Sequence, residues 1–544
     1  MNKPKNLFSR FGTYTLILLW AMVWLIFFQG WYHYHFFFQE QNQLFLNSWS
    51  YIFTYFEKPA WLACLLGDWL TQFYYYLYAG PVILCCALFL TGIVCLKALR
   101  TAGIQRPWLA TSIAMMIMTI EAIFSFHYDH RLPSVLAVTG GATIFWLSTL
   151  LTRHINRHSQ WLSAMMIFLS ATLTFWLFGC GIWMYSLLLI TGWLIHIKEA
   201  NSYLHLGILA ITLFIISICK RIYFLPFDAL YSYPGIGKLI MPQLDLEKTF
   251  AADDEYYFGN YSKLTRMVEA DPNPNQYMKY YYNLVMAQQR KLPDRLLAFS
   301  NNYLGTFENI GPDTPTLTIK TLNELYWILG DMTFAERATI LGMVNSPNNR
   351  NIRMTKRLAE INIVNGEWNA ARKFLRILQK TFVWHTWAEQ LLNALDHPEG
   401  EPQGLLKAYQ EKANLTNLTD TIRLSDNSYT IMQELLESNA ENHIALDYLL
   451  CSDLLLKDMD TFKRDYDQYC YRMENPPYQT KLYQEALMIY LAGTHAPQSE
   501  WQKYIHRNDL LERFLQYNEQ RGSDAFNDTY WYYFDKAKTP KLSK

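Results

Sequence analysis

The chain has 544 residues, enough for two or three domains, and its 47 basic and 47 acidic side chains give a formal net charge of zero. The zero sum hides a division at about Arg221, because residues 1–221 hold 13 Lys and Arg but only 6 Asp and Glu. No basic patch points to nucleic acid, which excludes it as a partner. The two cysteines of the polar half, Cys451 and Cys470, could pair outside the cytoplasm but make no disulfide framework.

Residues 1–221 predict a helical membrane domain with about seven spans. An apolar run from Phe11 to Phe28 follows basic residues and has no small-residue cleavage site, so it predicts an uncleaved first span. The other predicted spans are 79–97, 107–126, 132–152, 160–178, 181–197 and 203–219. The fifth and sixth are nearly continuous, and Gly179-Cys180-Gly181 predicts a tight turn between them.

Basic residues in the short loops predict the orientation of these spans. If the N-terminus is cytoplasmic, nine basic residues face inward and four face outward. The inward set is Lys3, Lys5, Arg10, Lys97, Arg100, Arg106, Arg153, Arg157 and Lys198, and the outward set is Lys58, Arg131, Lys220 and Arg221. The sequence therefore predicts a multi-pass protein of a bacterial inner membrane, with everything after Arg221 in the periplasm.

The stretch from Trp31 to Tyr78, which we call the aromatic belt, holds 19 Phe, Trp or Tyr residues among 48. Aromatic rings with a polar tip favour the boundary between hydrocarbon and water. Apolar residues at helical spacing predict one amphipathic helix over 43–57 and a second that begins at Pro59. Neither is apolar all round for the length of a span, so we expect both to lie in the interface.

The second half predicts an α-helical domain over residues 245–544, joined to the first by a linker over 222–244. Gly330-Asp331-Met332 and Gly366-Glu367-Trp368 each stand between two helical runs, and Ala335 and Ala371 follow at the same spacing. Gly-x-large-apolar-x-x-Ala is typical of tetratricopeptide-like helical hairpins, and the 36-residue spacing is close to their ~34 residues. An irregular helical domain without true repeats stays an alternative.

Ionisable residues gather at the predicted outer face of the membrane domain. They are Glu40 in the aromatic belt, Asp68 on the second interfacial helix, Glu121 near the end of a span, and His127, Asp129, His130 and Arg131 in the loop after it. A carboxylate within a span generally faces a cavity or a partner, and Arg131 is the nearby counter-charge for Glu121. One hypothesis is a single site, in which acids activate an acceptor or bind a metal while His and Arg hold a phosphate.

Structural roles explain the same residues equally well. Glu121 could pair with Arg131 or a neighbouring span. His127 and His130 could be interfacial residues with solvated tips, and Glu40 could be an acid at the start of a helix. His33 and His35 have no Cys or carboxylate at ligand spacing, so the sequence does not favour a metal site there.

The layout of residues 1–221 resembles the C-type membrane glycosyltransferases, which take sugars from polyprenyl-phosphate carriers. One span, an outer loop with Glu40, two interfacial helices and six further spans carry this resemblance. It implies that Glu40 and Asp129 are catalytic acids, that a divalent metal ion is a candidate cofactor and that the substrate is a lipid-linked sugar. The loop reads Glu40-Gln41, where those enzymes have paired acids. The whole chain also resembles a family of bacterial polytopic membrane proteins with helical C-terminal domains, which supplies no activity.

The sequence thus favours an integral membrane protein built on a glycosyltransferase-like module. The alternative is a non-enzymatic scaffold of the cell envelope, whose helical domain binds partner proteins. A transporter is disfavoured because the spans show no matched halves.

Overall fold

The computed structural model describes residues 5–154, 160–195, 200–218, 227–235, 244–299, 302, 304, 311, 313–397, 404–416 and 427–538. Every regular element among these residues is a helix, so the all-α prediction is confirmed. Contacts divide the chain into two compact units. The membrane unit is Met1–Phe250 with Ile377–Thr386, and the helical unit is Ala251–Arg376 with Trp387–Lys544. Lys3, Arg157, Lys198, Lys220 and Arg221, on which part of the orientation rests, lie outside the described residues.

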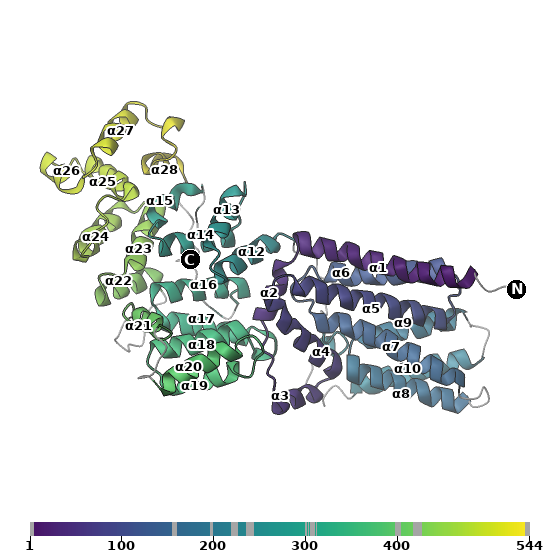
Figure 1. Ribbon diagram of the computed structural model, residues 1–544. Coiled ribbons are helices and arrows are strands. Elements are labelled where there is room, and N and C mark those ends of the chain that lie inside the picture. The colour runs from purple at the N-terminus through teal and green to yellow at the C-terminus, as the bar shows by residue number, and fades with distance from the viewer. Residues whose placement is uncertain are drawn as a thin grey trace. The chain divides into compact units, whose positions relative to one another are not determined.

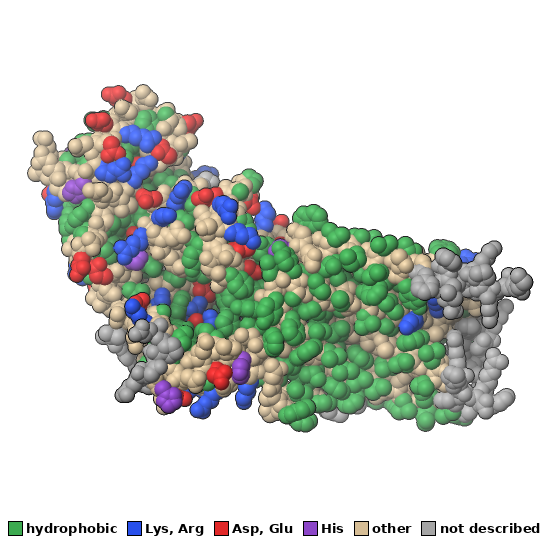
Figure 2. Space-filling model, viewed as in Figure 1, with side chains coloured by type: hydrophobic (Ala, Val, Ile, Leu, Met, Phe, Trp, Pro, Cys, Tyr) green, Lys and Arg blue, Asp and Glu red, His purple; other side chains and the backbone are tan. Residues whose placement is uncertain are grey.

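Seven helices of the membrane unit run side by side as a bundle (Figure 1). They are α1 (Lys5–Trp31), α5 (Ala79–Ala102), α6 (Pro107–Phe124), α7 (Leu132–His154), α8 (Gln160–Phe178), α9 (Gly181–Ile195) and α10 (Ala200–Ile218). Among the described residues, five of these helices are long and apolar enough to cross a membrane, and α9 and α10 are shorter apolar helices. Hydrophobic side chains cover the visible outer surface of the bundle (Figure 2). Several long apolar helices are what a membrane protein needs, whereas the count of seven spans stays a prediction.

Small residues let the bundle helices approach closely. A Cβ added at Gly141 on α7 would lie 2.0 Å from the carbonyl oxygen of Gly181 on α9, so both backbones depend on glycine there. The predicted turn between α8 and α9 is confirmed, and Gly179 makes it with a positive φ of 50°. The next residue, Cys180, donates its N–H to the carbonyl of Tyr233 at 2.8 Å. This turn therefore fixes Tyr233, which lies in the predicted linker, against the bundle.

The aromatic belt forms short helices in place of two long ones. They are α2 (Tyr34–Gln41), α3 (Trp49–Phe53), the 3-10 helix η1 (Thr54–Glu57), α4 (Trp61–Thr71) and the 3-10 helix η2 (Gln72–Tyr75). The predicted helix over 43–57 begins only at Trp49, because Ser48 before it is extended. The second begins at Trp61, since Ala60 takes a left-handed conformation that a helix cannot include. The sequence pattern does not predict α2.

After α11 (Phe227–Leu230) and α12 (Leu246–Tyr257) come the short helices of the helical unit (Figure 1). Those to residue 396 are α13 (Tyr261–Ala270), α14 (Gln276–Gln288), α15 (Leu292–Arg295), η4 (Leu296–Ala298), α16 (Thr316–Leu329), α17 (Met332–Val344), η5 (Pro347–Asn349), α18 (Ile352–Val364), α19 (Trp368–Leu378) and α20 (His385–Asp396). The remainder are α21 (Lys407–Ala413), α22 (Ser428–Ser438), α23 (His443–Leu456), α24 (Met459–Tyr469), η7 (Cys470–Arg472), α25 (Lys481–Gly493), α26 (Gln498–Tyr504), α27 (Asn508–Glu519), η8 (Asp524–Phe526) and α28 (Tyr530–Lys536).

The two predicted glycine turns join helices as the sequence pattern indicates. Gly330 between α16 and α17 has a φ of 89°, and Gly366 between α18 and α19 has a φ of 75°. Ala335 and Ala371 are fully buried, as the close packing of a helical hairpin requires. The helix–turn–helix pattern is therefore present at both positions, while the tetratricopeptide assignment stays a prediction. Cys451 and Cys470 are buried free thiols.

A buried charge network joins three helices of the helical unit. Arg353 on α18 lies 2.8 Å from Asp253 on α12 and 3.0 Å from Glu324 on α16, and Arg357 reaches Glu324 at 2.7 Å. Burial alone would raise the pKa of Glu324, but the two guanidinium groups lower it to about 2. Breaking such a pair would leave a buried charge without compensation, so this network fixes the helix arrangement.

Asp453 on α23 is the opposite case, a buried acid that forms no ion pair among the described residues, although Arg464 offsets part of the effect of burial on its pKa. Its side chain is nearly inaccessible, and the described residues give one of its carboxylate oxygens no hydrogen-bond donor. Burial and the neighbouring Asp458 raise the pKa of Asp453 to about 8. The folded chain therefore holds a proton on this group at neutral pH that the unfolded chain releases.

We expect stability to fall as pH rises from about 4 to about 8, because over this range only the folded state keeps the Asp453 proton. One proton corresponds to a slope of about 1.4 kcal/mol per pH unit. Asp453→Asn should reduce this slope by that amount and stabilise the unit most at pH 8. Urea unfolding of residues 245–544, checked first for a helical circular-dichroism spectrum, measures the slope. An unchanged slope would contradict the assignment, and Asp509→Asn at an exposed position is the control.

Candidate functional site

The best-defined polar cluster of the membrane unit surrounds Arg131, directly before α7. Arg131 Nη2 lies 2.5 Å from Asp68 Oδ1 on α4 and donates to Gln43 Oε1 at 2.8 Å. Tyr55 donates its hydroxyl to the other oxygen of Asp68 at 3.0 Å. Burial opposes the positive charge, but Asp68 raises the pKa of Arg131 above its ordinary value. Four segments of the chain thus meet in one ion pair and its hydrogen bonds.

Two hydrogen bonds of Gln39 place the end of α2 beside the loop that carries Arg131. Gln39 Nε2 donates to the carbonyl of Tyr128 at 3.0 Å and lies 3.3 Å from that of His130. Gln43 Nε2 donates to the backbone carbonyl of Asp68 at 3.1 Å. Because Gln39 and Gln43 flank Glu40 in the sequence, the segment that holds Glu40 is fixed against residues 128–131.

Glu40 lies in the last turn of α2, not at a helix start as one interpretation of the sequence has it. Its side chain is buried, with 1% of its surface exposed, and Gln41 Nε2 donates to Glu40 Oε2 at 2.5 Å. The helix dipole disfavours a carboxylate at this end, so the dipole does not explain the residue. Burial and the nearby Glu40 raise the pKa of Tyr75.

Glu121 is paired, though not with the partner that the sequence indicates. Its Oε2 lies 3.3 Å from His130 Nε2, and both side chains are buried. Arg131 contacts Asp68 instead. The loop after α6 folds back through a hydrogen bond between His130 N–H and the carbonyl of His127, which brings His130 rather than Arg131 over the end of that helix.

His127 and Asp129 form a looser contact within the same loop. Asp129 Oδ2 lies 3.8 Å from His127 Nδ1, and the Asp129 N–H donates to that nitrogen at 3.2 Å. Burial lowers the pKa of His127. The Asp129 side chain is 57% exposed, so it is the most accessible of the predicted acids.

The structure adds residues that sequence analysis did not select. Gln43 and Tyr55 belong to the aromatic belt, where only the polar run over 39–43 gave a signal. Cys64 Sγ donates a hydrogen bond to the hydroxyl oxygen of Tyr233 at 3.5 Å, although the two residues are 169 positions apart in the sequence. Glu247 Oε2 lies 3.5 Å from His35 Nδ1, a pairing that no local spacing could indicate. Burial raises the pKa of Cys64 to about 12, so this thiol is no nucleophile at neutral pH.

The cluster does not fit the divalent metal ion that the glycosyltransferase resemblance implies. Within the part of the chain that the structure describes, no three His, Cys, Asp or Glu side chains are placed to hold one. Asp68 already faces a guanidinium, and Glu121 faces an imidazole. The chemistry that the cluster can perform is binding of an anion and transfer of a proton.

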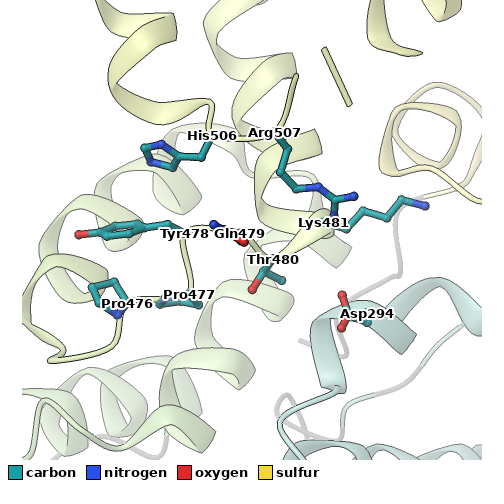
Figure 3. A pocket seen from close by; sticks show the side chains of 9 residues that line it. All are labelled: Asp294, Pro476, Pro477, Tyr478, Gln479, Thr480, Lys481, His506 and Arg507. Atoms are coloured by element: carbon teal, nitrogen blue, oxygen red, sulfur yellow. The ribbon is translucent and has the colours of Figure 1, made fainter. Parts of the chain in front are cut away.

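The helical unit contains a separate pocket of about 720 Å³. Figure 3 shows Tyr478 and two prolines on one side of it, with Lys481, Arg507 and Asp294 on the other. Lys481 lies 2.9 Å from Asp528, and Arg507 lies 2.7 Å from Asp509. Both cations of this pocket therefore have carboxylate partners, as Arg131 does.

The ion pair predicts a specific pattern of variant stability. Arg131→Gln should destabilise the full chain by roughly 3–5 kcal/mol, because it leaves Asp68 buried and without its counter-charge. Asp68→Asn combined with Arg131→Gln should restore most of the loss, since neither charge remains. Scanning fluorimetry in detergent measures both, and Arg106→Gln at an exposed position should change little. A double variant as unstable as the single one would contradict the pairing.

One family model matches residues 9–537, and its description is "Family of unknown function (DUF6057)". No curated protein matches the chain. No solved structure matches it either.

Proposed function

The chain belongs to the DUF6057 family, and because that membership supplies no activity, we propose a function from the cluster around Arg131. We propose that the membrane unit binds the phosphate of a polyprenyl-phosphate-linked sugar at Arg131 and transfers the sugar to an acceptor. The proposal keeps the glycosyltransferase resemblance of residues 1–221 and needs no metal ion.

The observation that carries this proposal is the remaining donor capacity of Arg131. Its hydrogen bonds with the described residues both use Nη2, and 19% of the side chain is exposed. Nε and Nη1 are therefore the donors for a ligand. A guanidinium group binds phosphate through paired N–H groups, and Asp68 and Gln43 hold its plane in a fixed orientation.

In the proposed reaction, the acceptor hydroxyl attacks the anomeric carbon of the sugar while the bond to the phosphate oxygen breaks. The phosphate leaves with the bonding electron pair, and Arg131 stabilises its charge. Glu40 or Asp129 takes the proton of the acceptor hydroxyl. His127 and His130 belong to the same loop as Arg131, and His130 is paired with Glu121. Asp68 acts as a positioning residue for Arg131.

Binding of the carrier phosphate can be separated from folding. Asp68→Asn with Arg131→Gln should give a stable chain that no longer binds a polyprenyl phosphate, which native mass spectrometry from detergent detects. Retained binding by this double variant would remove Arg131 from the site.

We place the site on the periplasmic face of a bacterial inner membrane, because the short loops on the other face hold nine basic residues. A reporter fused after residue 230 should then be active only in the periplasm. A reporter that is active in the cytoplasm would mean either one span fewer or an inverted bundle, and an inverted bundle would move the aromatic belt to the cytoplasmic face.

Glu40→Gln tests the proposed base. The amide keeps the shape and an acceptor for Gln41 but cannot take a proton, so the rate should fall by a factor on the order of 10²–10⁴. In a cell lacking the native gene, the variant should resemble the deletion at normal protein abundance. Glu57→Gln, an exposed acid of the same belt, is the matched control and should complement fully.

Full complementation by both Glu40→Gln and Asp129→Asn, the two candidate bases, would favour the alternative function, a membrane-anchored scaffold. The specific observation for that alternative is the pocket beside Tyr478 and His506 in the helical unit, which could hold a segment of an envelope protein.

A further inference from the structure

Residues 379–384 connect α19 to α20, yet they belong by their contacts to the membrane unit. The Asn47 N–H donates to the carbonyl of Lys380 at 2.8 Å. The ring of Phe382 lies 5.2 Å from that of Phe73, and the ring of Trp384 lies 5.7 Å from that of Tyr75. A loop from late in the chain is thus part of the aromatic belt.

The loop has a defined internal structure. Thr381 is buried, donates its hydroxyl to the carbonyl of Leu378 at 2.7 Å and accepts the N–H of Trp384 at 3.2 Å. His385 Nδ1 lies 2.5 Å from the carbonyl of Gln379. These bonds close the loop at its base, so the position of Phe382 at its tip follows from the fold.

The tip presents apolar surface. The Phe382 side chain is 51% exposed although it contacts Phe73, and Phe73 in turn lies 5.4 Å from the exposed ring of Trp69. Leu77 and Tyr78 are exposed at the start of α5, which is long and apolar enough to cross the membrane. Tyr75, which contacts Trp384, is followed in the sequence by the exposed Tyr76, Leu77 and Tyr78, so exposed side chains continue along the chain from the loop's contacts to the beginning of α5.

We infer that residues 379–384 are a membrane-contacting loop, with Phe382 in the boundary between lipid headgroups and acyl chains. The occupant is the bilayer that the long apolar helices cross. Continuity with α5 carries this choice, because the end of a span is where the interface lies and where aromatic rings gather. The exposed Lys380 beside Phe382 suits the phosphates of anionic lipids.

This inference goes beyond the proposed function and does not depend on it. A sugar transferase and a scaffold would both have the loop, so failure of the Arg131 experiments leaves it untouched. It also gives the chain after Arg376 a second point of attachment to lipid, in addition to the spans.

A photo-reactive benzoylphenylalanine at position 382 tests the inference in the full chain. The protein is placed in vesicles of phosphatidylethanolamine and phosphatidylglycerol, illuminated, and examined for lipid adducts by mass spectrometry. The same group at Leu19, exposed on α1, is the positive control, and at Leu515, exposed on α27, it is the negative control. We expect an adduct yield at 382 on the order of tenfold above that at 515, because only the former side chain enters the acyl boundary.

A yield at 382 equal to that at 515 would overturn the inference, and so would adducts at 382 to protein in place of lipid. The second result would identify the surface as an interface with another chain. Because Phe382 is half exposed and the replacement is also aromatic, the fold should tolerate it.

Discussion

The arrangement of Gln43, Tyr55 and the loop before α7 depends on one constraint, which is that the charges of Arg131 and Asp68 are buried together. Removing two ions from water costs several kcal/mol each, and only close geometry with further hydrogen bonds offsets that cost. Gln43 and Tyr55 supply those bonds, so the aromatic belt must fold back over α4 and over the loop before α7. A pair of apolar residues would hold these segments at lower cost. The presence of charge there is the physical reason for proposing that the cluster has a function.

The predicted interfacial position of the belt would connect this cluster to the bilayer. Its residues Gln43 and Tyr55 make the polar contacts around Arg131, while Trp49, Phe53 and Phe56 of its short helices are exposed. Residues 379–384 extend the exposed face with Phe382. A lipid-linked substrate would carry its phosphate at the same level as these rings. In the proposed function, an interfacial belt and a phosphate site would belong to one arrangement, which a freely diffusing substrate would not need.

Patterns that are local in sequence predicted the fold well, while pairings across the chain could not be predicted. Runs of apolar residues gave the long helices, and glycines gave the turns at Gly179, Gly330 and Gly366 because only a positive φ closes them. Arg131 was expected to pair with Glu121 because they are ten residues apart, yet it pairs with Asp68 on a different helix. The contacts of Glu247 with His35 and of Phe382 with Phe73 span still longer separations. The short helix α2 could not be predicted from the sequence, because most of its residues are Tyr, His and Phe, whose helix propensity is modest.

An electron cryomicroscopy map of the chain with a polyprenyl phosphate bound would show whether Arg131 binds the phosphate. We expect phosphate density within hydrogen-bond distance of Arg131 Nε and Nη1, with Asp68 still on Nη2 and the lipid chain leaving along the exposed rings of the belt. Phosphate density elsewhere on the chain, with Arg131 in contact only with Asp68 and Gln43, would contradict this expectation and leave the pair a structural one.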